Sequence, residues 1–235
     1  IIDVNCNDRH TLVLANDGET TNLFGTGENG RGQLGLGDYI DRGKNSKGVV
    51  DQILKLKKKN IKTINLMGNH EEFLLDFLFN KKNNIKNWLD FGVDQTFKSY
   101  DIEIVEFIKD GFNDVVIDKL RTVFLDKIDS NHIDFFKNLE TNYSTEKYFF
   151  VHAGIDPKKK LFDQDKKDFL WSRSSEFFHK DFTAEKIIVH GHTPEQDSIN
   201  YPYRINIDTG CYFSGKLTSV CLSDIDDSRV FYSNL

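Results

Sequence analysis

The sequence is poor in the features that mark disulfide-rich, membrane and nucleic-acid-binding proteins. Its 235 residues include only three cysteines, without metal-ligand spacing, which argues against a disulfide framework. No apolar run approaches about 18 residues, so we expect no transmembrane helix. The chain begins without a signal-peptide pattern. With 31 basic and 37 acidic residues the net charge is −6, which offers no general electrostatic grip on nucleic acid. We therefore expect a cytoplasmic protein with neither a membrane nor a nucleic-acid partner.

Lysine is missing from the N-terminal part of the chain and first occurs at Lys44. Seven of the 16 glycines, in contrast, lie within residues 1–37. This change of composition predicts two regions, an N-terminal segment over residues 1–37 and a domain over residues 38–235. The hydrophobic fraction of 38% is sufficient for a packed core, so we do not expect global disorder.

The N-terminal segment has the pattern of a β-hairpin followed by a glycine-rich loop. Two short alternating runs, residues 11–14 and 20–24, flank Asn16-Asp17-Gly18, and Asx-Gly between such runs is a strong hairpin signal. Residues 10–37 resemble one blade repeat of the regulator-of-chromosome-condensation propeller family. A single blade cannot bury its own faces, so we expect this segment to pack on another part of the protein or to remain poorly ordered.

Beyond residue 38 the pattern changes to alternating helices and strands. Residues 45–54 predict a capped helix, because Val49, Val50, Ile53 and Leu54 recur at helical spacing. Several helical patterns within residues 84–146 predict a helical insertion. Short apolar runs predict strands over 61–66, 147–151, 186–189, 204–207, 217–222 and 230–232.

Polar motifs recur at the ends of the short apolar runs. They are GDYIDRG at residues 37–43, GNHE at 68–71, VHAG at 151–154 and VHGHT at 189–193. In an open sheet such strand ends converge on one edge, where ligands bind. Their Asp, Asn and His side chains offer mixed oxygen and nitrogen donors, which suit divalent Mn, Fe, Zn or Co. Each motif alone is ordinary, but the four in this order favour a metal site.

Together these motifs resemble the calcineurin-like metallophosphoesterase superfamily, and within it the bacterial members of the phosphoprotein (serine/threonine) phosphatase branch. The resemblance covers about residues 37–222, with WLDFG at 88–92, WSR at 171–173 and IDTGC at 207–211 adding to it. It implies an α/β fold of the α+β sandwich kind. Its two-layered β-sheet core would be flanked by helices, with an atypical β-hairpin at the N-terminus.

The resemblance also implies a metal-dependent phosphoester hydrolase, with a phosphorylated protein as the first choice of substrate. A symmetrical diadenosine tetraphosphatase, acting on a small phosphoester, is the alternative within the same superfamily. The metal ions would be two divalent cations, with Mn²⁺ as the first choice and Fe, Zn or Co as alternatives. Asp38 would bridge the two ions, and Asn69, His152 and His192 would complete the shell of the second. We expect His190 to be a structural histidine at a strand end, since the pattern places the ligand after the glycine.

Catalytic and substrate-binding roles follow from the same resemblance. His70 would be the general acid that protonates the leaving oxygen, and Asp41 would orient it and keep it cationic. Arg42 would hold a phosphate oxygen, with Asn69 beside it, and Arg173 is a candidate for a second arginine clamp. Arginine suits this role because its planar fork matches phosphate oxygens.

The first motif of the family, Gly-Asp-x-His-Gly, has no match in this chain. Asp8 and His10 keep the Asp-x-His spacing and Asp8 lies 30 residues before Asp38, but the His-Thr of a propeller repeat accounts for His10 equally well. If both residues bind metal, the first metal site is rebuilt and two ions bind. If neither does, one ion binds, and the chain is a weakly active phosphatase or a non-catalytic interaction module.

Overall fold

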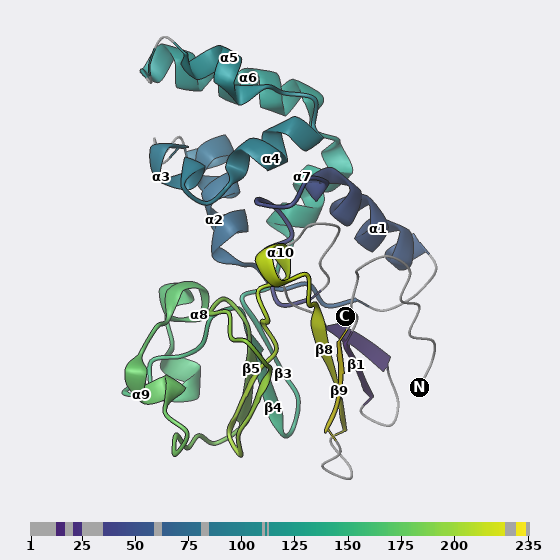
Figure 1. Ribbon diagram of the computed structural model, residues 1–235, viewed down its shortest axis with the longest axis vertical. Coiled ribbons are helices and arrows are strands. Elements are labelled where there is room, and N and C mark those ends of the chain that lie inside the picture. Colours follow the sequence, from purple (N-terminus) through teal and green to yellow (C-terminus); the bar gives the residue numbers. More distant parts are fainter. Residues whose placement is uncertain are drawn as a thin grey trace.

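The computed structural model describes residues 13–16, 21–24, 35–58, 63–80, 85–109, 111, 113–223 and 229–233. Within these residues, two β-sheets form the lower part of the molecule in Figure 1, and a group of helices lies above them. No helix in these ranges combines the length and the apolar character needed to cross a membrane.

The larger sheet has a parallel centre and antiparallel edges. Its central strand pairs are parallel, whereas each edge strand runs antiparallel to its neighbour. In the run Tyr148–Val151, alternate side chains enter two different hydrophobic clusters, so all four are buried. A strand covered on both faces has to be apolar throughout, which explains its continuous YFFV sequence. The sheet order is β3 (Asn142–Ser144), β4 (Tyr148–Val151), β5 (Ile187–His190), β7 (Arg204–Asn206) and β6 (Ile199–Asn200).

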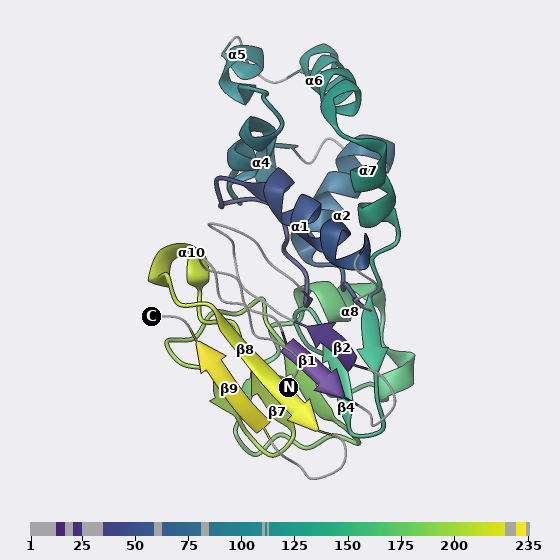
Figure 2. The ribbon, with the colours of Figure 1, turned by 90° about the vertical axis from the view of Figure 1, so that its right-hand side faces the viewer.

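The smaller sheet joins the N-terminal hairpin to the C-terminal strands (Figure 2). Its order is β2 (Thr21–Phe24), β1 (Val13–Asn16), β8 (Thr218–Ser223) and β9 (Arg229–Ser233). β1 pairs antiparallel with β2, which confirms the predicted hairpin, and pairs parallel with β8. The hairpin therefore adds strands to an existing sheet. The resemblance of this segment to a propeller repeat stays a prediction.

Hydrophobic side chains fill the space between the two sheets and cover the outer face of the larger one. Tyr148, Phe150 and Ile205 of the larger sheet pack with Val220 and Leu222 of β8. On the opposite face, Phe149 of β4 packs against short helices. Figure 1 shows the resulting succession of helices, larger sheet and smaller sheet. These helices are η2 (Leu161–Asp163), α8 (Lys166–Trp171) and α9 (Ser175–Phe178), and α10 (Cys211–Ser214) precedes β8.

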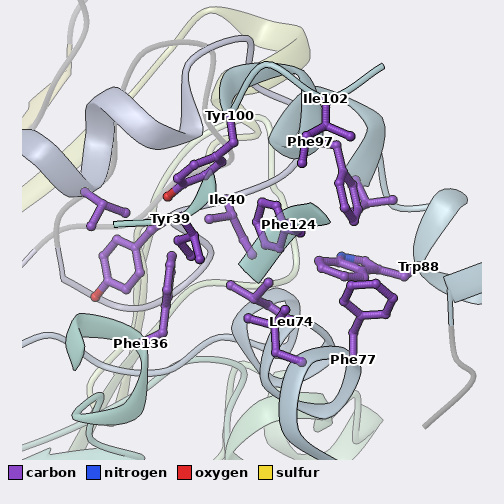
Figure 3. Packing of buried hydrophobic residues seen from close by; sticks show 14 of the residues in the cluster. Tyr39, Ile40, Leu74, Phe77, Trp88, Phe97, Tyr100, Ile102, Phe124 and Phe136 are labelled. Carbon is purple, nitrogen blue, oxygen red and sulfur yellow. The ribbon is translucent and has the colours of Figure 1, made fainter. Parts of the chain in front are cut away.

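The helices above the sheets have their own aromatic core, which Figure 3 shows from close by. Phe97 packs against Phe124 with ring centroids 4.8 Å apart and against Trp88 at 6.0 Å. Trp88, Phe97 and Phe124 are fully buried, and aromatic rings at such separations add to the stability of a core beyond their buried area. This helical layer consists of α1 (Ser46–Lys58), α2 (Asn69–Leu75), η1 (Asp76–Asn80), α3 (Ile85–Leu89), α4 (Val93–Ser99), α5 (Ile104–Ile108), α6 (Asp114–Lys127) and α7 (Ser130–Lys137).

The strand predicted over residues 61–66 is only partly formed in its described part, residues 63–66. Leu66 makes an isolated parallel bridge with Glu140. Its backbone N–H donates to the carbonyl of Gly35 at 2.8 Å, and the N–H of Met67 donates to the carbonyl of Glu140 at 2.7 Å. The N–H of Glu140 also donates to the carbonyl of Asn65 at 3.0 Å. Two hydrogen bonds with Glu140 and one with Gly35 hold this segment, so it forms a bridge and not the continuous ladder of a strand.

Candidate metal and catalytic site

Backbone strain is concentrated at the predicted site. Asp38, Asp41, Arg42 and His192 have φ values of 57°, 71°, 54° and 65°. Among non-glycine residues in the described part of the chain, Asp101 is the one other with a positive φ. Such conformations cost on the order of 1–3 kcal/mol each and persist only where the surrounding structure enforces them. Four of the five strained non-glycine residues thus belong to the predicted site, and two of them, Asp38 and His192, are predicted metal ligands.

Four of the predicted metal ligands converge. His152 Nε2 lies 2.9 Å from Asn69 Oδ1, 3.0 Å from His192 Nδ1 and 3.4 Å from Asp38 Oδ1. His192 Nδ1 is also 3.0 Å from Asn69 Oδ1. The loop before α1, the start of α2, and the turns after β4 and β5 each supply one of these side chains. The structure thus brings together Asp38, Asn69, His152 and His192, which are far apart in the sequence.

The chemistry of these donors fits a divalent cation. His152 Nδ1 donates to the carbonyl of Leu36 at 2.7 Å, so the lone pair of Nε2 faces the oxygens of Asn69 and Asp38. Electron pairs that face one another repel unless a cation lies between them. Ligands about 2.1 Å from a metal are separated by about 3.0 Å in octahedral and about 3.4 Å in tetrahedral arrangements, which matches the observed spacing.

The environment of His192 favours the neutral form that metal binding requires. Burial lowers the pKa of His192 well below its usual range, and the charges of His152 and Arg173 lower it further. Because a protonated imidazole cannot bind a metal, this environment favours the ligand form at every pH near neutrality. The influence of Arg173 also shows that its guanidinium lies within electrostatic reach of the cluster, although Arg173 itself is exposed.

Glu71 positions the loop that carries Asp38, a role that the sequence analysis missed. The side chain is fully buried and accepts hydrogen bonds from the backbone N–H groups of Gly68 at 2.8 Å, Asp38 at 2.9 Å and Tyr39 at 2.7 Å. Burial, with the negative charge of Asp38 beside it, raises the pKa of Glu71 to about 7. Its place directly after His70 in the GNHE motif is the signal that could have identified it.

Gly68 allows the two loops to approach closely. A Cβ atom at this position would lie 2.1 Å from Asp38 Oδ1 and 2.5 Å from the backbone N of Asp38. No side chain fits at these distances, so the close packing of GDYIDRG on GNHE requires glycine here. The same contact sets Asp38 opposite Asn69, the first residue of α2.

His70 and Asp41 form the predicted pair beside the metal cluster. His70 Nδ1 donates to Asp41 Oδ2 at 2.7 Å, which leaves His70 Nε2 facing Asp38 Oδ2 at 3.9 Å. Asp41 also accepts hydrogen bonds from Trp88 Nε1 at 2.5 Å and Thr96 Oγ1 at 2.6 Å. Trp88 was expected as a core residue and as part of the WLDFG motif, and Thr96 only as part of a helical region; neither was expected to contact Asp41. Their polar groups fix the carboxylate that orients His70.

The two predicted phosphate-binding arginines lie at the more open side of the site. The backbone N–H of Arg42 donates to the carbonyl of Gly92 at 3.0 Å, and its guanidinium lies 4.6 Å from the centre of the Tyr212 ring. Arg42 is half-buried, whereas Arg173, two residues beyond α8, is exposed. Both side chains are therefore at least partly accessible from solvent.

His190 stands apart from the metal cluster, in keeping with the structural role expected for it. Its Nδ1 donates to the carbonyl of Gly191 at 3.0 Å, and its Nε2 accepts a hydrogen bond from Arg204 Nη1 at 3.2 Å. Burial, followed by the charge of Arg204, lowers its pKa to about 3. Both ring nitrogens are thus used within the fold. Asp8 and His10, the two remaining predicted ligands, lie outside the described residues.

Comparison with known proteins identifies relatives over most of the chain. Residues 6–221 match the family described as calcineurin-like phosphoesterase. A curated relative, the bis(5'-nucleosyl)-tetraphosphatase PrpE [asymmetrical] of Anoxybacillus flavithermus, is 27% identical over 215 residues, which cover 86% of this chain and 80% of the relative. A crystal structure provisionally described as a diadenosine tetraphosphatase aligns with a TM-score of 0.52 and 14% identity, covering 87% of this chain and 81% of the other.

These matches confirm the expected family and fold. The solved structure supports the arrangement of mixed sheets and helices, and the family match extends across all four motifs. The activity in the name of this relative corresponds to the type of small-molecule substrate that was the alternative in the sequence analysis. The serine/threonine phosphatase branch and the choice of manganese stay predictions.

Proposed function

Since the chain belongs to the calcineurin-like phosphoesterase family, we propose that it is a metal-dependent hydrolase whose preferred substrates are dinucleoside polyphosphates. The main observation in support of this reaction is the convergence of four predicted metal ligands, Asp38, Asn69, His152 and His192. The paired His70 and Asp41 lie beside them. The substrate class is supported by the tetraphosphatase relative, which aligns with 86% of this chain.

A divalent cation held by Asp38, Asn69, His152 and His192 would supply Lewis-acid stabilisation of a phosphoryl oxygen and would lower the pKa of a water molecule. The protein supplies the remaining groups. His70 is anchored through Nδ1, so its Nε2 is the atom that donates a proton to the leaving oxygen. The carboxylate of Asp41 stabilises the protonated imidazole that this step requires.

Arg42 and Arg173 bind the phosphate oxygens in this proposal. The protein as a whole carries a net charge of −6, so it does not attract anions from a distance. Local guanidinium groups must therefore provide the attraction, and their planar forks match phosphate oxygens in a bidentate manner. A polyphosphate chain has several such oxygens and can contact the metal and both arginines together.

A phosphorylated protein is the second candidate substrate, and the resemblance of residues 37–43 and 68–71 to the phosphoprotein phosphatase branch favours it. In both cases the same groups act on a phosphoryl centre. The two candidates differ in the leaving group, which is a serine or threonine hydroxyl in one and a nucleotide in the other. A third outcome, a catalytically impaired interaction module, follows if the first metal site is not rebuilt.

Steady-state hydrolysis with Mn²⁺ tests the proposal. Diadenosine tetraphosphate, a phosphoserine peptide and p-nitrophenyl phosphate are compared by kcat/KM, with the His70→Asn variant as control for contaminating phosphatases. We expect the dinucleotide to be preferred at least tenfold over the peptide. Products of ATP and AMP indicate asymmetrical cleavage, whereas ADP alone indicates symmetrical cleavage. Preference for the peptide refutes the proposed substrate, and no turnover by the folded protein supports the interaction module.

A further inference from the structure

An exposed aromatic pair lies on α10, beside the predicted phosphate-binding Arg42. Tyr212 is 43% exposed and Phe213 is 64% exposed. The two rings stand nearly perpendicular, with centroids 4.8 Å apart and an interplanar angle of 88°. The Arg42 guanidinium lies 4.6 Å from the centre of the Tyr212 ring, a cation–π arrangement. In Figure 1, α10 lies between the helical layer and the sheets.

The pair is held in place by its backbone. Gly210 and Gly215, on either side of α10, have positive φ values of 64° and 72°. The N–H of Gly210 donates to Asp208 Oδ1 at 2.9 Å, and Ser214 Oγ donates to the carbonyl of Thr209 at 2.7 Å. A Cβ atom on Gly210 would lie 2.2 Å from the Phe213 ring, so this ring packs directly against the glycine. A ligand that binds here would therefore order little of the protein.

The position of the pair suits a ligand that carries an anion next to an aromatic group. Arg42 directly follows Asp41, whose carboxylate accepts a hydrogen bond from His70, and the Arg42 guanidinium lies over the exposed ring of Tyr212. A nucleotide has this combination, because its phosphates are anionic and its base is flat and aromatic. A phosphoserine side chain has no aromatic group to place on Tyr212 or Phe213. Stacking of bases on exposed aromatic side chains is a general, sequence-tolerant source of affinity.

We propose that Tyr212 and Phe213 form a stacking platform for one nucleobase of a substrate whose phosphate is bound at Arg42. This inference rests on the proposed function and deepens it, because it assigns recognition of the nucleoside to α10. The metal cluster and the arginines act on the polyphosphate chain, and the platform distinguishes a nucleotide from an inorganic polyphosphate or a phosphopeptide.

Binding of two matched, non-hydrolysable ligands tests the platform. Calorimetry with Mn²⁺ compares α,β-methylene-ADP with methylenediphosphonate, which differ in the adenosine. We expect the wild type to bind the nucleotide at least tenfold more tightly. Tyr212→Ala and Phe213→Ala should each reduce this preference severalfold, and Tyr212→Phe should retain it. The ratio of the two affinities is the measured quantity. A substitution that merely displaces Arg42 would weaken the binding of both ligands equally and leave this ratio unchanged.

Phe162→Ala is the matched control, since Phe162 is a 78% exposed phenylalanine on η2. Tyr212→Leu, which keeps the bulk of the side chain, replaces Tyr212→Ala if that variant fails to fold. Equal binding of both ligands to the wild type, or an unchanged ratio in the platform variants, overturns the inference. Hydrolysis of diadenosine tetraphosphate is measured in parallel. A normal rate with an unchanged ratio refutes the platform alone, whereas a nucleotide preference without hydrolysis refutes the proposed function and leaves the platform standing.

Discussion

At the scale of single residues, the orientation of His70 depends on how completely Asp41 is hydrogen-bonded. The Asp41 carboxylate is buried and accepts from His70 Nδ1, Trp88 Nε1 and Thr96 Oγ1, and the Asp41 N–H donates to Thr96 Oγ1 at 2.7 Å. A buried carboxylate with this many donors has its hydrogen-bonding capacity satisfied and has little freedom to turn. The imidazole that it holds is therefore aimed by groups that lie outside the metal cluster.

Replacement of the imidazole tests its role as general acid. We expect His70→Asn to retain the bound metal while reducing kcat for p-nitrophenyl phosphate by at least about a hundredfold, because general acid assistance is worth about 10²–10⁴ in rate. Metal content is measured by elemental mass spectrometry and turnover by absorbance. Unchanged turnover would remove His70 from the mechanism, and loss of metal would make it a ligand.

Thr96 is predicted to act through Asp41. Thr96→Val keeps the shape of the side chain but leaves the Asp41 N–H and one carboxylate oxygen without their partner. We expect kcat to fall about tenfold, the range found when a group that orients a site residue is lost. The metal content should not change, and Thr96→Ser should restore the rate because it keeps the hydroxyl. A fall in kcat that Thr96→Ser does not reverse would show that packing, and not the hydrogen bond, is responsible.

The residues that bear the chemistry were predictable from the sequence, whereas most of their supports were not. Asp38, Asn69, His152 and His192 follow short strands or glycines in recognisable motifs, and the structure brings them together. Thr96 contacts Asp41 across 55 positions of sequence. A threonine inside a helical pattern carries no local sign that its hydroxyl faces a carboxylate so far away, and only the packing of the helices reveals it.

At the scale of elements, a chain of polar side chains connects three helices of the helical layer. Tyr100, which follows α4, donates to Nδ1 of His132 on α7 at 2.8 Å. His132 Nε2 in turn lies 3.2 Å from Asp51 Oδ1 of α1. His132 is fully buried, so each of its ring nitrogens needs a partner. This chain ties α1, which follows the metal-binding turn, to the rest of the layer.

Removal of the Tyr100 hydroxyl is expected to destabilise this layer. Tyr100→Phe leaves His132 Nδ1 buried without its donor, which costs about 1–3 kcal/mol. Chemical denaturation at pH 7 measures the change in the free energy of unfolding, with Tyr203→Phe, at an exposed position, as the control. An equal effect of both variants would show that the buried hydrogen bond contributes no stability of its own.

The pH dependence of the same variant follows from the raised pKa of the phenol. Burial, with the charges of Asp51 and Asp129, raises the pKa of Tyr100 above its usual range. The folded protein therefore holds this proton more tightly than the unfolded chain does. This contribution to stability is complete below about pH 10 and is lost as the pH rises above it. Unfolding measured from pH 9 to 11 should therefore show the wild type losing its advantage over Tyr100→Phe.

Longer elements were predictable where one hydrophobic pattern determines them. The helix that begins near Ser46 and the strand over Tyr148–Val151 form as expected, since each has a continuous apolar stripe or run. β3 and β6 were not foreseen, because three and two residues are too short to establish a period. Their pairing with β4 and β7 depends on where the chain returns to the sheet, which a local pattern does not encode.

At the scale of the whole molecule, the site depends on two parts of the fold with separate cores. The sheets place His152 and His192 at strand ends, and the helical layer supplies Trp88 and Thr96 to the carboxylate of Asp41. The N-terminal hairpin joins the smaller sheet through β8, far along the chain. The composition of residues 1–37 indicated a distinct segment, but it contained no signal for this parallel pairing.

The number of metal ions that the protein binds shows whether the N-terminal segment also contributes ligands to the site. The described residues provide the donors of one cation site, in Asp38, Asn69, His152 and His192. We expect the wild type to bind two equivalents of Mn²⁺, with Asp8 and His10 supplying ligands to the ion of the first metal site. The double variant Asp8→Ala, His10→Ala should then bind one equivalent, and adding His152→Ala should abolish that as well.

Calorimetric titration with Mn²⁺ counts these sites directly. The melting temperature in excess Mn²⁺ provides an independent readout, because an ion that binds only the folded protein stabilises it. Stabilisation by Mn²⁺ should decrease in the double variant and disappear in the triple variant. A wild type that binds a single equivalent, and a double variant that behaves identically, would mean that Asp8 and His10 are not ligands. The hairpin would then serve the sheet alone, and Asp38 would hold one ion without bridging to another.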